Sequence, residues 1–226
     1  MQSSVSILGI AGASGSGKTT LATLLAGKLG DALATIVSLD WYYHCGAHLP
    51  EDLRAQQIFD RPDAIDHELL ARHLDELKAG RTITAPGYDF ANHVRVTGSP
   101  VSSRPLVIVE GFLLLCFPEV RKRLDTALYV EAPRETRFER RIRRDVEERG
   151  RNPISIRCQL ERDVIPSEEQ FIIPSAQHAD VVVLNDGDRS ALLRQVVELP
   201  WKSPLDKFFV PGVVRDSASA QIRSAG

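Results

Sequence analysis

The segment that most constrains the fold of this chain is GASGSGKTT at residues 12–20, which follows the apolar run VSILGI and precedes residues with helical spacing. It fits the pattern GxxxxGK[ST], in which glycines let the backbone turn its N–H groups toward phosphate oxygens. In this pattern Lys18 supplies a positive charge near the terminal phosphates, and the Thr19 hydroxyl is a ligand for Mg²⁺. The segment therefore predicts a site for ATP, or GTP, made of Gly12, Ala13, Ser14, Gly15, Ser16, Gly17, Lys18, Thr19 and Thr20.

Other features of the sequence exclude several classes of protein. A nucleotide-driven switch would need the patterns DxxG and NKxD, and neither occurs. The formal net charge of −2 sets up no field that would attract nucleic acid or an anionic membrane. The three cysteines lack CxxC spacing, and no apolar run approaches the ~20 residues that span a bilayer. We therefore expect a cytoplasmic protein whose partners are small molecules.

Five short apolar runs have the composition of buried strands and alternate with segments of helical spacing. Such alternation favours an α/β fold in which a five-stranded parallel sheet is flanked by helices. An apolar stripe between Ile65 and Leu77 predicts one helix, and a highly charged helix is expected from Pro133 to Gly150. The strand-like runs are Val5–Ile10, Thr35–Leu39, Leu106–Val109, Ala127–Val130 and Asp180–Leu184.

The connection between the second and third runs, from Trp41 to Pro105, is far longer than one crossover helix requires. We expect residues 41–105 to form a small insertion lobe near the carboxyl ends of the strands, where ligands bind in such folds. The lobe is the natural place for the molecule that receives a phosphate. Residues 1–200 then form a single domain, and residues 201–226 are a C-terminal extension with a flexible end.

Two carboxylates stand at the ends of predicted strands, Asp40 in VSLD and Glu110 in VIVEG. In a parallel sheet both would emerge at the same edge as the phosphate-binding loop. A hydroxyl that attacks a phosphate must lose its proton, which a carboxylate can accept, and Mg²⁺ prefers hard oxygen ligands. We expect Asp40 to be the catalytic base, and Thr19, Asp40 and Glu110 to serve the metal ion. Turn hydrogen bonds are the alternative role for both carboxylates.

The lobe contains two chemically dense stretches, IFDRPDAID with Phe59 beside Asp60, and PGYDFANHVR with Tyr88, Phe90 and His93. Phenylalanine faces can stack on a flat heterocycle, and tyrosine or histidine can hydrogen-bond its edge. A carboxylate can also accept hydrogen bonds from both hydroxyls of a ribose. The composition alone leaves open a hairpin whose aromatic residues form only a minor core.

Several stretches, in this order, resemble the uridine kinase (uridine–cytidine kinase) family of P-loop kinases: DWYY from Asp40, FDRPDAID, PGYDFANHVR, VIVEGFLLL and RRDVEERGR. The resemblance runs from about Ser6 to Val183, whereas the stretch LNDGDRSALL departs from the usual glycine-rich pattern of the family. It implies transfer of the ATP γ-phosphate to the 5′-hydroxyl of uridine or cytidine. It also implies a homotetramer that pyrimidine triphosphates inhibit by feedback.

The same resemblance implies roles for individual residues in binding the nucleoside. Asp60 with Arg141 would hold the ribose hydroxyls, and Tyr88 with His93 would read the edge of the pyrimidine. The two phenylalanines would flank the base, and Gln159 would lie near the nucleoside. The implied substrate-binding residues are Phe59, Asp60, Tyr88, Phe90, His93, Arg141 and Gln159.

An arginine-rich segment follows the fourth predicted strand. Guanidinium groups stabilise the negative charge that spreads over a phosphoryl group during transfer. We expect about residues 144–172 to form a lid over the phosphates, in which Arg144 and Arg149 are catalytic together with Lys18. Arg151 is expected to bind the nucleotide.

The interleaved glutamates of this segment also allow a simpler interpretation, a solvated helix held by ion pairs. Helical spacing places Arg137, Arg141 and Arg144 on one face. Arg140 and Arg143 are expected to be plain surface charges.

The sequence thus favours an ATP- and Mg²⁺-dependent kinase for pyrimidine ribonucleosides, with two alternatives. The first is a related P-loop kinase for another small hydroxylated acceptor, such as a phosphorylated sugar or pantothenate. Those acceptors offer no flat base for the aromatic residues of the lobe. The second is a catalytically silent regulatory protein that binds a nucleotide. The presence of Lys18, Thr19, Asp40 and Glu110 argues against it.

Overall fold

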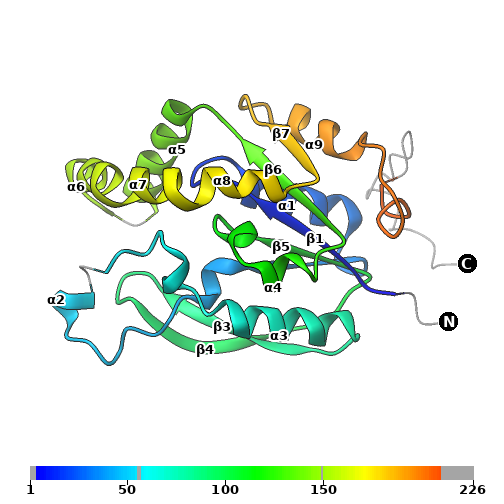
Figure 1. Ribbon diagram of the computed structural model, residues 1–226, viewed down its shortest axis with the longest axis horizontal. Helices are drawn as coiled ribbons and strands as arrows, with labels where there is room; N and C mark the ends of the chain where they lie inside the picture. Colours follow the sequence, from blue (N-terminus) through cyan, green and yellow to red (C-terminus); the bar gives the residue numbers. More distant parts are fainter. Residues whose placement is uncertain (1–3, 55–56, 149, 210–226) are drawn as a thin grey trace, which may run out of the picture.

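A computed structural model describes residues 4–54, 57–148 and 150–209. At its centre lies a five-stranded parallel sheet with the strand order β2-β5-β1-β6-β7 (Figure 1). The five strands coincide with the five predicted runs within one residue at their starts and within one at their ends, which confirms the predicted α/β fold. The strands are β1 (Ser6–Ala11), β2 (Ala34–Ser38), β5 (Leu106–Glu110), β6 (Thr126–Glu131) and β7 (Val181–Leu184).

Alternation along the central strands divides the core into two layers, because successive side chains of a strand point to opposite faces. Leu8 and Ile108 face α1 (Lys18–Leu29) and α9 (Arg189–Val197). Ile7 and Val107 face the opposite layer. That layer contains α3 (His67–Lys78), the short helix α4 (Pro118–Arg121) and a 3-10 turn at Leu114–Cys116 (Figure 1). Helices therefore cover both faces of the sheet.

Helix α3 confirms the prediction made from the apolar stripe. Leu70, Leu74 and Leu77 are fully buried along one side of it. The helix begins after Asp66, whose side chain accepts a hydrogen bond from the backbone N–H of Leu69 at 3.1 Å.

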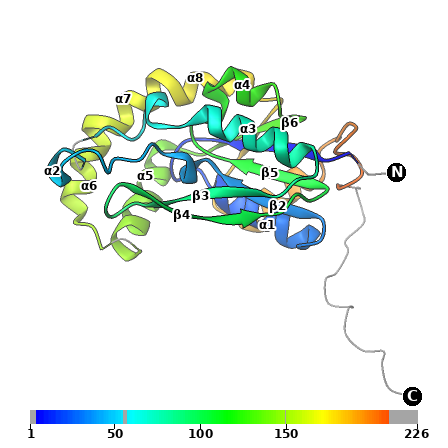
Figure 2. The same cartoon turned by 90° about the horizontal axis from the view of Figure 1, so that it is seen from below.

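The chain between β2 and β5 builds additional structure beside the sheet (Figure 2). It begins with a 3-10 turn at Leu39–Tyr42 and continues through α2 (Glu51–Arg54) and a second 3-10 turn at Pro62–Ala64. After α3 it forms an antiparallel hairpin of β3 (Ile83–Asp89) and β4 (Val94–Val101). The domain boundaries expected from the sequence remain predictions.

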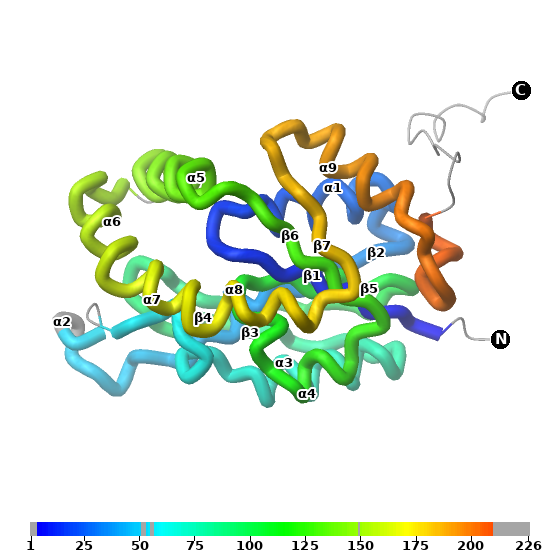
Figure 3. The backbone as a smooth tube through the Cα atoms, turned by 45° about the horizontal axis from the view of Figure 1, so that its top comes forward, coloured from blue at the N-terminus to red at the C-terminus, as the bar shows by residue number. Residues whose placement is uncertain are grey.

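Two further helical segments follow β6. Helix α5 spans Arg134–Glu147, in agreement with the predicted charged helix. The backbone then forms one continuous helical segment, called here the helical coil, through α6 (Pro153–Gln159), α7 (Ile165–Ser167), α8 (Ile173–Ser175) and a 3-10 turn at Ala176–His178 (Figure 3).

This coil contains two π turns, Leu160–Val164 and Glu168–Ile172. Each is followed within two residues by a proline, Pro166 or Pro174. A proline has no N–H to donate to the carbonyl of the preceding turn, so a local widening lets the coil continue past it.

The described part of the C-terminal extension packs against the α1–α9 layer. Leu205 and Phe209 are buried there, and the Trp201 indole donates to the carbonyl oxygen of Val196 at 2.8 Å. The expected flexible end falls on residues 210–226, which lie outside the described residues. Within the described ranges, every helix is too short or too polar to cross a membrane.

Candidate active site

The phosphate-binding loop joins β1 to α1 and needs glycine at two positions for distinct reasons. Gly15 has φ +77°, and a Cβ there would lie 2.3 Å from the carbonyl oxygen of Arg137. Gly17 has φ +100°, and a Cβ there would lie 2.2 Å from Nδ2 of Asn185. The loop leads directly into the N-terminus of α1 at Lys18, where helix geometry favours negative charge.

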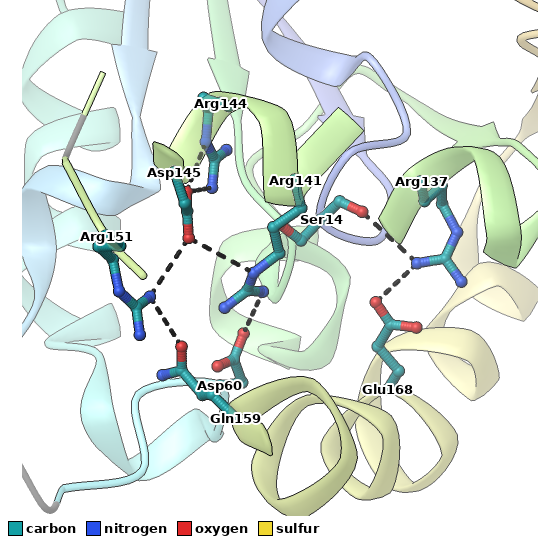
Figure 4. Close-up of polar contacts among 9 residues, drawn as sticks. All are labelled: Ser14, Asp60, Arg137, Arg141, Arg144, Asp145, Arg151, Gln159 and Glu168. Atoms are coloured by element: carbon teal, nitrogen blue, oxygen red, sulfur yellow. Dashed lines mark hydrogen bonds and ion pairs between the residues drawn. The ribbon is translucent and has the colours of Figure 1, made fainter. Parts of the chain in front are cut away.

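Side chains from other elements hold the carbonyl oxygens of this loop. Asn185 Nδ2 donates to the carbonyl of Ser16 at 2.6 Å. Arg137 and Arg140 donate to the carbonyls of Ser14 and Gly15 at 3.5 and 3.3 Å (Figure 4 draws the first of these). Arg140 is therefore more than the surface charge that the sequence predicted, because its position one helical turn after Arg137 brings it against the loop.

A chain of hydroxyl and carboxyl groups runs from the loop to the end of β2. Thr19 Oγ1 donates to Glu110 Oε2 at 3.2 Å, and Ser38 Oγ donates to Glu110 Oε1 at 2.6 Å. Ser38 Oγ in turn accepts from the backbone N–H of Asp40 at 3.3 Å. Burial raises the pKa of Glu110, and nearby Asp40 raises it further, whereas Lys18 opposes the shift. These hydrogen bonds bring together Thr19, Asp40 and Glu110, the three residues predicted to bind a metal ion.

The oxygen atoms of these hydrogen-bonded groups fit a magnesium ion. Asp40 Oδ1 is buried and has no hydrogen-bond partner, although a carboxylate oxygen withdrawn from water normally requires one. The backbone N–H of the same residue ends the row of hydrogen bonds that contains the Thr19 hydroxyl and the Glu110 carboxylate. Hydroxyl and carboxylate oxygens are the ligands that Mg²⁺ prefers.

A cavity of about 710 Å³ opens beside the loop and brings together residues from distant parts of the chain. Most of the predicted acceptor-binding residues line it, whereas Tyr88 and Glu110 lie outside the lining. The lining residues are Ser14, Lys18, Thr19, Asp40, Tyr43, Phe59, Asp60, Phe90, Ala91, His93, Phe112, Arg141, Arg144, Glu148, Arg151 and Gln159.

Aromatic rings form one wall of this cavity, with Tyr43 at their centre. Its ring centroid lies 5.1 Å from Tyr88, 5.8 Å from Phe59 and 6.0 Å from Phe90. The His93 ring stacks on Phe59 at 4.4 Å, so one face of Phe59 is covered by the residue predicted to read the base edge. Tyr88 Oη and His93 Nδ1 are both buried without a hydrogen-bond partner. Of these two residues, His93 lines the cavity, whereas Tyr88 packs behind Tyr43.

His93 occupies the turn between β3 and β4 with φ +55°, a left-handed conformation that is uncommon for a residue with a side chain. Such conformations cluster at functional sites because the surrounding structure must hold them. Burial lowers the pKa of His93, and the positive charges of Arg151 and Arg54 lower it further. The imidazole is therefore neutral near pH 7, with one donor and one acceptor nitrogen.

Charged residues also line the cavity, and Figure 4 draws the polar contacts among them. Arg141 Nη1 and Asp60 Oδ1 lie 3.4 Å apart, and both side chains are buried. This contact joins the two residues predicted to hold the ribose hydroxyls. Of the predicted lid, Arg144 and Arg151 line the cavity, whereas Arg149 lies outside the described residues.

A second cavity, of about 330 Å³, also opens at the loop. The two cavities meet at the phosphate-binding loop, because both are lined by Lys18, Thr19, Arg141, Arg144 and Glu148. The remaining lining residues of the second cavity are Gly15, Gly17, Thr20, Arg140, Arg143, Asn185, Gly187, Arg189 and Leu192. Two cavities that share residues of the loop suit a donor nucleotide and an acceptor.

Sequence reasoning missed five residues of this site, Ser38, Tyr43, Phe112, Asp145 and Asn185. The first four lie inside the stretches VSLD, DWYY, VIVEGFLLL and RRDVEERGR that were singled out for other residues. Asn185 lies in LNDGDRSALL, the stretch that departs from the family pattern, and its side chain reaches the phosphate-binding loop.

Comparisons with known proteins show the family to which this sequence is related. The model of the Phosphoribulokinase / Uridine kinase family matches residues 7–190. Uridine kinase from Chloroflexus aurantiacus is 38% identical to this chain over 192 residues, which cover 84% of this chain and 92% of that protein. Uridine kinase from Shewanella pealeana is 41% identical over 187 residues, which cover 80% and 88%.

Solved structures share the fold. Phosphoribulokinase from Rhodobacter spheroides has a TM-score of 0.58 at 13% identity, covering 85% of this chain and 75% of that chain. A possible uridine kinase from Bacillus stearothermophilus has a TM-score of 0.51 at 24% identity, covering 80% and 90%. With a family match over most of its length and the sheet and loop of a P-loop kinase, this chain belongs to the phosphoribulokinase/uridine kinase family.

Proposed function

We propose that this protein transfers the γ-phosphate of ATP to the 5′-hydroxyl of uridine or cytidine and so produces UMP or CMP. One observation carries the proposal. A single cavity connects Lys18 and Thr19 of the phosphate-binding loop with the buried Asp60–Arg141 contact and with an aromatic wall. The names of the curated relatives from Chloroflexus aurantiacus and Shewanella pealeana support the same acceptor.

The acceptor is held through chemistry that suits a pyrimidine ribonucleoside. The Asp60 carboxylate accepts hydrogen bonds from the ribose hydroxyls, and Arg141 beside it donates to them. His93, whose ring lines the cavity, pairs with the polar edge of the base, and Tyr88 supports this wall through its ring contacts with Tyr43 and Phe90. Phe59 and Phe90 supply apolar surface for the faces of the base.

Phosphoryl transfer follows from the position of Asp40 in the same cavity. The Asp40 carboxylate accepts the proton of the 5′-hydroxyl while the hydroxyl oxygen forms a bond to the γ-phosphorus. The bond from the γ-phosphorus to the bridging oxygen breaks, and ADP leaves with that oxygen. Lys18 and the lid arginines Arg144 and Arg149 stabilise the charge of the transferred group, and Arg151 binds the nucleotide.

Thr19 would hold Mg²⁺, with Asp40 and Glu110 bound to the ion or to its waters. The ion would offset negative charge on the phosphates of the donor. ATP is the proposed donor, and GTP is an alternative because the phosphate-binding loop does not contact the base. We further propose a cytoplasmic enzyme that forms a homotetramer.

A phosphorylated sugar is the second candidate acceptor, because the matching family also contains phosphoribulokinases. The aromatic wall around Tyr43 argues against it, since a sugar phosphate offers no flat ring to pack there.

The experiment that tests the proposal incubates the protein with ATP, Mg²⁺ and either uridine or cytidine, and measures ADP and the nucleoside monophosphate. We expect equal amounts of ADP and of the nucleoside monophosphate. Lys18→Ala should abolish both, because it removes the charge beside the terminal phosphates. ADP production without a pyrimidine monophosphate would contradict the proposal.

A further inference from the structure

Asp145 lies fully buried at the end of α5, surrounded by arginines (Figure 4). Its Oδ1 accepts two hydrogen bonds from Arg144, from Nε at 3.0 Å and from Nη2 at 2.8 Å. Its Oδ2 accepts from Arg151 Nη1 at 3.3 Å and lies 4.0 Å from Arg141 Nε. The backbone carbonyl of Asp145 also accepts from the N–H of Arg151 at 3.0 Å. One carboxylate thus fixes guanidinium groups from two segments.

The charges around Asp145 explain why the carboxylate is needed. Three guanidinium groups this close repel one another, and the repulsion is strong where water is partly excluded. The side chains of Arg144 and Arg151 are 36% and 33% exposed, so solvent is available to them if they separate. Asp145 offsets the repulsion and keeps both guanidinium groups at the wall of the acceptor cavity.

The contacts of Asp145 also extend to the acceptor side of the cavity. Arg141, which faces Asp145, reaches Asp60 with its Nη1. Arg151 donates to Gln159 Oε1 at 2.9 Å with the same nitrogen that faces Asp145. Asp145 therefore lies between the phosphate-facing arginines and two residues proposed to contact the nucleoside.

We propose that Asp145 is a positioning residue that sets the guanidinium groups of Arg144 and Arg151 for phosphoryl transfer. The proposal rests on the proposed function of the same site. Asp145 is withdrawn from both cavities and touches no reacting atom, so it acts through the arginines. Misplacing a group that stabilises the transferred phosphate by about 1 Å can cost about 10² in rate. Among the residues proposed to bind the nucleoside, Arg141 faces Asp145 at 4.0 Å, but its buried contact with Asp60 does not depend on Asp145.

A matched control exists in the same chain. Asp163 is also buried, and it also pairs with the arginine immediately before it, at 2.8 and 2.7 Å from Arg162. The Arg162 side chain is 70% exposed, and neither residue lines a cavity at the phosphate-binding loop. Asp163→Asn therefore removes the same kind of charge without altering the arginines at the site.

The first experiment compares Asp145→Asn with Asp163→Asn. It measures the single-turnover rate of UMP formation, the KM values for uridine and ATP, and the melting temperature. We expect Asp145→Asn to lower the rate by about tenfold or more, with little change in the KM for uridine. Asp163→Asn should leave the rate unchanged. A normal rate for Asp145→Asn, or equal losses in the two variants, would overturn the proposal.

The second experiment is a double-mutant cycle of Asp145→Asn with Arg144→Gln, because a residue that acts through Arg144 loses its effect when Arg144 is gone. We expect the loss in the double variant to be clearly smaller than the product of the two single losses, with the remaining effect of Asp145→Asn passing through Arg151. Multiplicative losses would overturn the proposal, since unfolding or general damage combines in that way. A wild type that phosphorylates neither pyrimidine nucleoside would instead overturn the proposed function, and the cycle is then measured with the acceptor that it does phosphorylate.

Discussion

Arg137 and Glu168 form a buried ion pair beneath the phosphate-binding loop, with 2.6 Å between Arg137 Nη1 and Glu168 Oε1. The arginine also donates to the carbonyl oxygens of Ala132 and Ser14 (Figure 4 draws the contact with Ser14). The pair therefore links the π turn at Glu168–Ile172 to the loop that binds phosphate. Its two side chains are 6% and 0% exposed, so neither charge can be compensated by water if the other is removed.

Glu168→Gln should destabilise the protein by about 3 kcal/mol, because it leaves the Arg137 charge buried without its partner. The neighbouring Glu169 pairs with Arg134, but both side chains are well exposed at 56% and 39%. Glu169→Gln should therefore cost less than about 1 kcal/mol. Urea unfolding of the two variants measures the difference. Equal stabilities would show that the Arg137–Glu168 pair does not hold the fold together.

Asp40→Asn should lower the turnover of uridine by about 10² or more, because the amide cannot accept the proton of the attacking hydroxyl. ATP binding should largely survive, since it depends on the phosphate-binding loop. Asp63→Asn is a suitable control, because Asp63 lies in the same connection between β2 and β5 and its side chain is 73% exposed. Steady-state kinetics and ATP titration test both variants. Near-normal turnover in Asp40→Asn would remove this carboxylate from the mechanism.

Deoxyuridine should be a much poorer substrate than uridine. Without the 2′-hydroxyl, the buried Asp60 and Arg141 lose a polar partner, and sites built around a hydroxyl reject its absence by up to roughly 10⁴. The ratio of kcat/KM for the two nucleosides measures this discrimination. Asp60→Asn should reduce the ratio by lowering activity with uridine. Comparable kcat/KM values in the wild type would mean that the contact does not read the ribose.

The choice between uridine and cytidine should depend on pH through His93. Burial, Arg151 and Arg54 disfavour the charged imidazole, so its pKa lies below the ordinary 6.5 and the ring stays neutral as pH falls to that value. A neutral ring offers a donor or an acceptor, whereas a charged ring only donates and therefore suits the carbonyl of uracil but not the amine of cytosine. We expect the uridine-to-cytidine ratio of kcat/KM to be constant above pH 6.5 and to rise at lower pH.

His93→Asn is the control for this pH dependence. Asparagine tolerates the left-handed backbone at this position and does not titrate, so the fold is kept while the pH response is removed. Its uridine-to-cytidine ratio should not vary with pH, and its kcat/KM should be lower for both nucleosides. A ratio that changes in the same way in wild type and His93→Asn would exclude His93 as its source.

The parts of this structure that could be predicted are those with a local pattern. The strand β1, the phosphate-binding loop and α1 follow from one stretch of sequence, and α3 follows from the spacing of its leucines. Asp40 could be placed at the edge of the sheet because the ends of parallel strands share that edge. Each of these predictions depends only on residues close together in the chain or on the sheet topology.

The parts that could not be predicted depend on contacts between distant elements. The pattern of charges on α5 is the same whether an arginine faces water or the loop, so Arg140 was misjudged and the role of Asp145 was not seen. The coil after Pro153 passes Pro166 and Pro174 through π turns, whereas a proline in a sequence normally indicates the end of a helix.

The central claim is that the hydroxyl of a pyrimidine nucleoside receives the phosphate. The most direct measurement gives the protein ATP, Mg²⁺ and an equimolar mixture of uridine, cytidine, adenosine, ribulose 5-phosphate and pantothenate, and identifies the phosphorylated products by mass spectrometry. The account predicts UMP and CMP, both carrying the phosphate at the 5′ position, with the other three acceptors unchanged. Phosphorylation of the sugar phosphate, pantothenate or adenosine in preference to both pyrimidines would contradict it.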